Sequence, residues 1–236
     1  MPEANGLDIL QDVADLFSWL KSPSNLASYL PQGVKADVDH VLVTGESAGG
    51  WLALQSALLP ASKQMISAVI SHYPMIDMRD PHYTGDHEKQ LFTPVVPQLD
   101  RSILQDYIAN MKEGLVVTSA VPPDRVPLVI SFLQQGAYKD FFGNENVLYP
   151  LEVLEDVTSL PPTWILHGTA DTVIPVDGTY EYERRVREKL PNAKFHVHYD
   201  KNSDHGFDND TNINLDTEWI KEGLTFIHPY WPQHSL

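Results

Sequence analysis

The sequence predicts an α/β fold in which a parallel sheet is covered by helices on both faces. Short runs rich in Val and Ile alternate along the chain with longer segments in which apolar residues recur at helical spacing. These runs are mostly apolar, too apolar for strands with one face in solvent, as expected of strands that are buried on both faces. A length of 236 residues fits one domain of ordinary size, and 42% hydrophobic residues allow a sizeable core.

Each element is predicted from its own pattern. Apolar residues at helical spacing indicate a first helix, which ends before Pro23. A β-branched run that stops at a glycine indicates the first strand, and Pro60 closes the helix that follows it. The sequence predicts strands over residues 38–44, 65–71, 163–167 and 194–199, with helices over residues 10–20, 48–59, 179–189 and 215–226.

The alternation breaks between residues 78 and 154, where prolines are frequent. Two helical pieces stand out in this stretch, over residues 103–111 and 126–133. We therefore expect a helical cap insertion over residues 78–154, on an α/β core formed by residues 1–77 and 155–236. The prolines that punctuate the insertion are at positions 81, 94, 97, 122, 123 and 127.

Charge and composition restrict the partners. Asp and Glu outnumber Lys and Arg by 32 to 16, and the net charge of -16 would repel phosphate backbones and anionic lipid surfaces. Nucleic acid is therefore not an expected partner. No window approaches the roughly 20 apolar residues of a membrane span, and the N-terminal segment has no leader pattern, so we expect a cytoplasmic protein. Cysteine is absent, so a metal site would need His and carboxylate ligands.

A serine stands where the first predicted strand gives way to a helix, because residues 45–49 read Gly-Glu-Ser-Ala-Gly and Gly50 follows. In a nucleophile elbow, a tight strand-to-helix turn raises the serine hydroxyl above the sheet edge, and small neighbours avoid collisions. We expect Ser47 to be the nucleophile, with the backbone N–H of Ala48 stabilising an oxyanion. The alternative, a glycine-rich turn of a nucleotide-binding fold, lacks the third glycine spacing and the downstream acidic partner.

A serine hydroxyl is a weak nucleophile at neutral pH, so it needs a histidine as base and an acid to orient that histidine. Asp171 follows the third predicted strand and His205 follows the fourth, which gives the order Ser, Asp, His along the chain. We therefore expect His205 to be the general base and Asp171 to orient it. Asp177 is the alternative acid, and Asp204 is expected to solvate the loop.

A second pair of histidines allows a different interpretation. His196 and His198 lie two residues apart on one face of a predicted strand and could act as metal ligands. A third ligand of clear spacing does not accompany them, so we expect neither a metal site nor a cofactor.

Together these motifs resemble the hormone-sensitive-lipase-like branch of the α/β-hydrolases. The resemblance rests on Gly-Glu-Ser-Ala-Gly-Gly at residues 45–50, on Leu-Pro-Pro at 160–162, on Gly-Thr-Ala-Asp at 168–171 and on His-Gly-Phe at 205–207. It implies an acyl-serine intermediate, no cofactor, and a cap that shapes the pockets for the acyl and alcohol groups of the substrate.

The sequence also departs from that family. Members carry a His-Gly-Gly loop that supplies further oxyanion N–H groups, and their sheets have several strands before the elbow strand. Neither feature is found in this sequence, so we expect an N-terminally truncated version of the fold with half of the oxyanion hole. The strand before Ser47 would then be an open sheet edge, through which the chain could form a homo-oligomer.

The expected activity is cleavage of small to medium carboxylic esters. An amidase or a peptidase would share the same chemistry. The alternative in a different class is a noncatalytic ligand-binding protein or an inactive truncated homologue. Such relatives usually lose a triad residue, whereas all three candidate residues are present here, which favours an enzyme.

Overall fold

The computed structural model describes residues 1–92, 94–112, 114–115 and 124–231, so prolines 122 and 123 of the expected cap lie outside the described residues. The strands are β1 (Val41–Glu46), β2 (Ile66–His72), β3 (Thr163–Gly168) and β4 (Phe195–Asp200). The helices are α1 (Gly6–Leu20), α2 (Pro23–Ala27), α3 (Ala48–Leu58), α4 (Pro81–Thr84), α5 (Ser102–Asn110), α6 (Val126–Gln134), α7 (Tyr138–Phe141), α8 (Pro150–Val153), α9 (Asp177–Lys189) and α10 (Glu218–Ile227). Short 3-10 helices are η1 (Asn146–Leu148), η2 (Leu154–Asp156) and η3 (Phe207–Asn209).

The four strands form one parallel sheet, as the sequence predicts, and their order in the sheet is β1-β2-β3-β4. Glu46 at the end of β1 lies opposite His72 at the end of β2, and Gly168 at the end of β3 lies opposite Asp200 at the end of β4. The carboxyl ends of the strands therefore meet at one edge of the sheet. In open parallel sheets the loops at this edge form the ligand-binding crevice, and the three candidate catalytic residues all lie in these loops.

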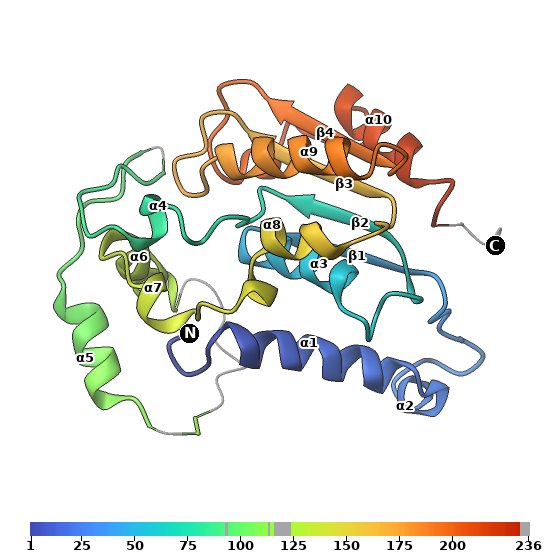
Figure 1. Ribbon diagram of the computed structural model, residues 1–236, viewed down its shortest axis with the longest axis horizontal. Coiled ribbons are helices and arrows are strands. Elements are labelled where there is room, and N and C mark those ends of the chain that lie inside the picture. Colours follow the sequence, from blue (N-terminus) through green and yellow to red (C-terminus); the bar gives the residue numbers. More distant parts are fainter. Residues whose placement is uncertain (93, 113, 116–123, 232–236) are drawn as a thin grey trace.

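Helices cover both faces of the sheet, which confirms the predicted layers (Figure 1). Successive strand residues point to opposite faces. Val69 of β2 and Ile165 of β3 pack with α1, α3, α8 and α9 on one face, whereas their neighbours Ala68 and Trp164 pack with α10 on the other. The two middle strands, β2 and β3, are largely apolar and buried, whereas β1 and β4 at the sheet edges are mostly only partly buried.

Helices α4 to α7 lie on the left of Figure 1, on the side toward which the strand arrows point. Their apolar side chains, among them Tyr83, Phe132 and Tyr138, pack in one cluster with Trp51 of α3. Helix α8 packs instead on α3 and α9. That residues 78–154 act as a cap is a proposal, which this packing supports for α4 to α7.

One predicted boundary is wrong because an aspartate side chain closes a turn. β1 begins at Val41 and not at residue 38. The Asp37 carboxylate accepts a hydrogen bond from the Asp39 N–H (3.1 Å) and lies 2.8 Å from His40 Nδ1. These local contacts compete with strand pairing, so the β-branched residue at position 38 does not begin the strand.

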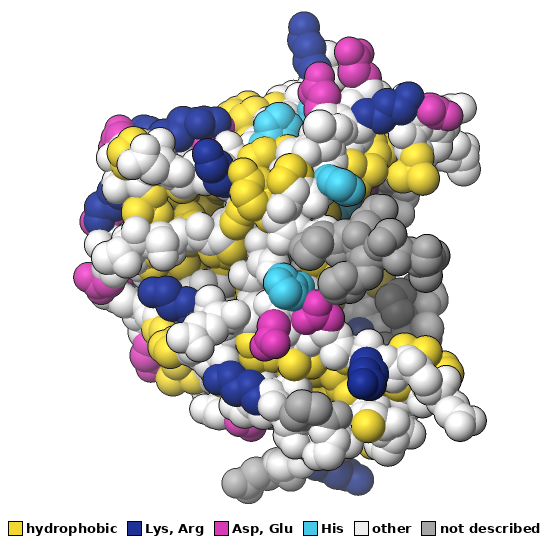
Figure 2. Space-filling view, turned by 90° about the vertical axis from the view of Figure 1, so that its right-hand side faces the viewer, with side chains coloured by type: hydrophobic (Ala, Val, Ile, Leu, Met, Phe, Trp, Pro, Cys, Tyr) yellow, Lys and Arg dark blue, Asp and Glu magenta, His cyan; other side chains and the backbone are white. Residues whose placement is uncertain are grey.

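The surface carries charges of both signs. Figure 2 shows one face of the molecule, on which acidic and basic side chains are interspersed among hydrophobic ones. On this face, therefore, the acidic side chains do not form a single patch. None of the helices in the described part of the chain is long and apolar enough to cross a membrane.

Candidate active site

The turn between β1 and α3 has the geometry of a nucleophile elbow. Ser47 adopts φ 56° and ψ -116°, and a sparsely populated conformation of this kind costs of the order of 1–3 kcal/mol. The Ser47 N–H donates to the carbonyl of His72 (2.9 Å), and the Ser47 carbonyl accepts from the N–H groups of Trp51 (3.1 Å) and Met75 (3.3 Å). These bonds to β2, to the segment that follows it and to α3 hold the strained serine at the carboxyl edge of the sheet.

Two glycines next to Ser47 are required by close packing. A Cβ added at Gly45 would lie 2.1 Å from the carbonyl oxygen of Gly49, and one added at Gly50 would lie 2.8 Å from the carbonyl oxygen of His72. An added Cβ at Gly49 would meet nothing within 4 Å. The expected need for small residues therefore applies at positions 45 and 50, whereas position 49 has room for a side chain.

Ala48 is the first residue of α3 and is exposed. The first N–H groups of an α-helix have no acceptor within the helix, and they lie at the positive end of the helix dipole. The Ala48 N–H can therefore donate to an anion formed beside Ser47, as an oxyanion donor must.

The loops after β3 and β4 bring Asp171 and His205 together. His205 Nδ1 lies 2.8 Å from Asp171 Oδ2, and the Asp171 side chain is fully buried while that of His205 is 12% exposed. The other carboxylate oxygen of Asp171 accepts from the N–H groups of Val173 (2.9 Å) and Ile174 (2.7 Å). The carboxylate is fixed by its own loop and in turn fixes one ring nitrogen of His205.

The protonation of this pair follows from the environment of Asp171. Burial raises the pKa of the Asp171 carboxyl group, but hydrogen bonds from His167 and His205 outweigh burial and lower the pKa to about 2. An ionised carboxylate only accepts hydrogen bonds, so Nδ1 of His205 carries the proton between them. Nε2 of a neutral His205 then has the lone pair that a general base needs.

His167 supports Asp171 from within β3, a role that the sequence motifs do not predict. His167 is fully buried, its Nε2 donates to the carbonyl of Ile174 (2.9 Å) and its Nδ1 accepts from the hydroxyl of Thr179 (2.7 Å). The same Nε2 lies 3.4 Å from Asp171 Oδ2. A signal was present in the sequence, since a histidine inside an apolar strand needs polar partners.

Two aromatic rings lie against the imidazole of His205. The ring centroids of Tyr73 and His205 are 4.5 Å apart, and those of Phe92 and His205 are 6.1 Å apart. Tyr73 comes directly after His72, whose carbonyl binds the Ser47 N–H. The end of β2 thus contacts both Ser47 and His205. The hydrogen bonds between described residues join His205 to Asp171 and include none from Ser47 Oγ.

The two other acids have different surroundings. Asp177, the alternative acid, begins α9, is exposed, and makes no hydrogen bond with His205 among the described residues. The expectation that Asp204 solvates the loop is wrong. Its Oδ1 accepts from the N–H (2.9 Å) and hydroxyl (2.8 Å) of Thr172 and from the His205 N–H (2.8 Å), so it ties the His205 loop to the Asp171 loop.

His196 and His198, considered above as metal ligands, pack on aromatic side chains of α10. The His198 ring stacks on Trp219 with centroids 4.7 Å apart and an angle of 11°, and the His196 ring lies 5.6 Å from that of Phe226. Burial lowers the pKa of His196. Both rings contribute to the layer between the sheet and α10.

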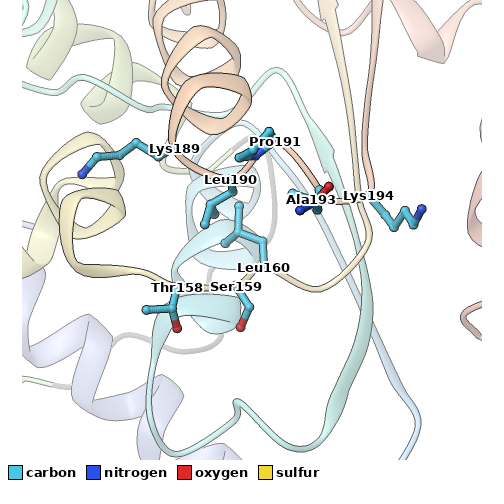
Figure 3. Close-up of a pocket in the computed structure, with 9 residues that line it drawn as sticks. Thr158, Ser159, Leu160, Lys189, Leu190, Pro191, Ala193 and Lys194 are labelled. Carbon is cyan, nitrogen blue, oxygen red and sulfur yellow. The ribbon is translucent and has the colours of Figure 1, made fainter.

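A pocket of about 300 Å³ lies away from the candidate residues (Figure 3). Its lining comes from residues 158–160, before β3, and residues 189–194, between α9 and β4. Both segments lead into the amino ends of strands, whereas the candidate catalytic residues follow the carboxyl ends. Lys189 and Lys194 point away from each other in Figure 3, so the charged groups of this pocket do not converge.

A family model of the alpha/beta hydrolase fold matches residues 2–209, which is most of the chain. The chain belongs to the alpha/beta hydrolase family. The resemblance that the motifs indicate is thereby confirmed, and the parallel sheet with helices on both faces is the core of that fold.

Two curated relatives of this α/β hydrolase are named probable carboxylesterases. The one from Phoma sp. is 30% identical over an alignment 236 residues long. The alignment covers 98% of this chain and 72% of the relative. The one from Cochliobolus lunatus is 32% identical over 180 residues, covering 74% of this chain and 81% of the relative. Among solved structures, the butyrate-bound esterase 2 of Thermogutta terrifontis matches with a TM-score of 0.56 at 17% identity, covering 98% of this chain and 69% of that one. This structural similarity shows the fold alone.

Proposed function

We propose that this α/β hydrolase is a serine esterase that cleaves small to medium carboxylic esters through an acyl-serine intermediate. The observation that carries the proposal is the contact of His205 Nδ1 with the ionised Asp171 carboxylate, at the same sheet edge as the strained turn of Ser47. The names of the two carboxylesterase relatives support an ester as the substrate.

In the first half of the proposed reaction, Nε2 of His205 takes the proton of Ser47 Oγ while Oγ forms a bond to the ester carbonyl carbon. The carbonyl oxygen becomes an oxyanion, and the Ala48 N–H stabilises its charge. Asp171 stabilises the imidazolium of His205. The bond to the alcohol oxygen then breaks, His205 returns its proton to that oxygen, and the acyl group stays on Ser47.

In the second half, His205 removes a proton from a water molecule, and the water oxygen forms a bond to the acyl carbon. The same oxyanion position is used again. The bond between the acyl carbon and Ser47 Oγ breaks, His205 returns the proton to Oγ, and the carboxylic acid leaves. This half restores the side chains to their starting state without any cofactor.

An apolar pocket of about 90 Å³ lies beside Ala48. Its small volume supports a substrate with a short acyl group. For comparison, an apolar protein cavity of about 150 Å³ is large enough to bind benzene. We propose that the pocket takes an acyl chain of about two to four carbons, on this comparison of volumes. Its lining includes Ile9, Trp51, Leu52, Met75, Met78 and Phe142.

Initial rates on p-nitrophenyl acetate, butyrate and octanoate test the proposal. We expect kcat/KM for acetate and butyrate to exceed that for octanoate by about 10-fold or more, because additional methylenes do not fit the pocket. Ser47→Ala should lower kcat by at least about 1,000-fold. Undiminished turnover in Ser47→Ala would contradict the assignment of Ser47 as the nucleophile. Faster cleavage of p-nitroanilides than of the esters would favour an amidase or a peptidase.

The partner and the location are also proposals. β1 pairs with β2 on one side, and among the described residues its other side has no strand partner. An open strand edge can pair with another chain, which supports a dimer through β1. Sedimentation velocity should then show a concentration-dependent dimer, and a monomer at every concentration would rule the dimer out. The cytoplasmic location rests on sequence expectation and is tested by cell fractionation.

A further inference from the structure

Four side chains that the proposed reaction does not use are joined at the same sheet edge. They are Glu46, which precedes Ser47; His72, the last residue of β2, and Tyr73, which follows it; and Asp208, in η3, three positions after His205. These four residues are called the Tyr73 network below. Its members come from three segments of the chain, and each segment carries or contacts a proposed catalytic residue.

Asp208 is the point at which the network meets the His205 loop. His72 Nδ1 lies 2.5 Å from Asp208 Oδ2, and the hydroxyl of Tyr73 lies 3.0 Å from Asp208 Oδ1. The Asp208 side chain is 12% exposed. Both of its carboxylate oxygens are therefore engaged by two consecutive residues of the β2 end, which fastens the loop three positions after His205.

The other side of the network faces the serine. The Tyr73 hydroxyl lies 3.2 Å from Glu46 Oε2, and the His72 carbonyl accepts the Ser47 N–H at 2.9 Å. Tyr73 has a φ of 36° and donates its N–H to the Leu166 carbonyl at 2.6 Å, while its ring lies against that of His205. His72 thus contacts the Ser47 turn through its backbone carbonyl and the His205 loop through its side chain. The side chain of Tyr73 contacts both Glu46 and the His205 loop.

The protonation states suit a hydrogen-bonded network. Burial, together with Asp208 and Glu46, raises the pKa of the Tyr73 phenol, so it stays a donor. Burial raises the pKa of the Asp208 carboxyl group, but hydrogen bonds from His72 and Tyr73 outweigh it and lower the pKa overall. The ligand atoms of Glu46, His72 and Asp208 lie within 4.8 Å of one another, but the direct contact between His72 and Asp208 leaves no space between them for a metal ion.

We propose that the Tyr73 network positions the His205 loop relative to Ser47, so that His72, Tyr73 and Asp208 are positioning residues for the proposed hydrolysis. The inference rests on the proposed function. In the proposed reaction, none of these three side chains bonds to the reacting atoms. They act by setting the distance over which the proton moves between Ser47 Oγ and His205, and a misplacement of about 1 Å can cost about 100-fold in rate.

Two single substitutions test the network, each with a matched control. Asp208→Asn keeps the size of the side chain but replaces one acceptor oxygen by a donor, and Asp210→Asn makes the same change at an exposed residue that bonds to Asn212. Tyr73→Phe removes one hydroxyl. Tyr199→Phe removes a hydroxyl that donates to Glu183 at 2.7 Å, between β4 and α9.

We expect Asp208→Asn and Tyr73→Phe to lower kcat by about 10- to 100-fold, with KM changed by less than about twofold, because substrate binding is retained and alignment is lost. Amide hydrogen exchange over residues 204–209, measured by mass spectrometry, should become faster in both. The two control variants should keep the wild-type kcat and the wild-type exchange over this segment. His72→Asn, which keeps an N–H donor near the position of Nδ1, should recover part of the kcat that His72→Ala loses.

Unchanged kcat and unchanged exchange in Asp208→Asn and Tyr73→Phe would overturn the inference. An equal loss of kcat in the two controls would overturn it as well, since the effect would not be specific to the network. If Asp208→Asn does not fold, Tyr73→Phe decides the test with the smaller change. A wild-type chain that hydrolyses no ester would refute the proposed function instead. The rate of hydrogen exchange over residues 204–209 would then show, without any measurement of turnover, whether the network holds the His205 loop.

Discussion

Ser47, Asp171 and His205 come from three loops, and each is held by groups close to it. Ser47 is held by the carbonyl of His72, Asp171 by two N–H groups of its own loop, and His205 by Asp171. Because each contact fixes one atom that the proposed chemistry uses, substitutions at these positions should change rates more than they change stability.

Asp171→Asn is the first such substitution. The amide can present an N–H to Nδ1 of His205, which would favour the wrong tautomer and remove the lone pair from Nε2. We expect kcat on p-nitrophenyl acetate to fall by about 1,000- to 10,000-fold. The matched control is Asp177→Asn at the start of α9, which should leave kcat within about twofold of wild type. The opposite pattern would transfer the orienting role to Asp177.

The pKa of Asp171 also predicts how stability depends on pH. The pKa is about 2 in the folded protein and 3.8 in a free side chain. Because the folded value is lower, the ionised carboxylate stabilises the fold above pH 3.8, and this contribution is lost as the pH falls toward 2. The difference corresponds to about 2 kcal/mol. Urea unfolding at about pH 5 and pH 2.5 should show a decrease that is larger in wild type than in Asp171→Asn; equal decreases would contradict the lowered pKa.

At the scale of elements, the contact between β1 and α3 leaves no room for a side chain at Gly45. Gly45→Ala should destabilise the protein by about 3 kcal/mol or more, because the added Cβ would lie 2.1 Å from the Gly49 carbonyl oxygen and backbone would have to move. Gly49→Ala, the matched control, adds the same methyl group where nothing lies within 4 Å. It should stabilise α3 slightly, since alanine is a better helix former than glycine.

Urea unfolding of the two variants measures this difference. If Gly45→Ala were as stable as wild type, the close approach of β1 and α3 would be wrong. If Gly49→Ala were the less stable of the two, position 49 and not position 45 would be the one without space for a side chain.

The strands and long helices could be predicted because their signals are local and repeated. The ends of elements could not, because single side chains decide them. Helix α10 begins at Glu218 and not at residue 215, since the Asn214 N–H bonds to the Thr217 hydroxyl (3.0 Å) and the Asp216 N–H to the Asn214 side chain (2.8 Å), closing a turn first. Leu215 is left 73% exposed, although its apolar character made it look like a helix residue.

The candidate site could be predicted in part for the same reason. Ser47, Asp171 and His205 each lie in a short motif directly after a strand, so the chain order indicates them. The Tyr73 network has no such motif, because its contacts join residues 46, 72, 73 and 208, and only folding brings these together. The role of Asp204 could not be predicted, because its partner Thr172 belongs to a different loop.

At the scale of the whole molecule, a polar contact joins the N-terminal segment to the expected cap. Glu3 forms an ion pair with Arg125 at 2.9 Å and accepts a hydrogen bond from the hydroxyl of Tyr107, and its side chain is 7% exposed. Burial raises the pKa of the Glu3 carboxyl group, but the bonds from Arg125 and Tyr107 outweigh it and lower the pKa to about 2. This contact links the first residues to α5 and to Arg125 at the start of α6.

Glu3→Gln should therefore lower the free energy of unfolding at neutral pH by about 1–3 kcal/mol, because Arg125 loses its charged partner in a half-buried position. Glu88→Gln, at an exposed glutamate, is the matched control and should change stability by less than about 0.5 kcal/mol. Urea unfolding measures both. Equal stability of the two variants would show that the link does not hold the N-terminal segment.

A fluorophosphonate probe, which forms a covalent bond with an activated serine, tests whether Ser47 is the nucleophile of a serine esterase. The wild-type chain is incubated with the probe, digested, and analysed by mass spectrometry for the peptide that contains Ser47. We expect one probe adduct on Ser47 and no adduct in Ser47→Ala. An adduct on another serine, or equal labelling of the wild type and Ser47→Ala, would contradict this assignment.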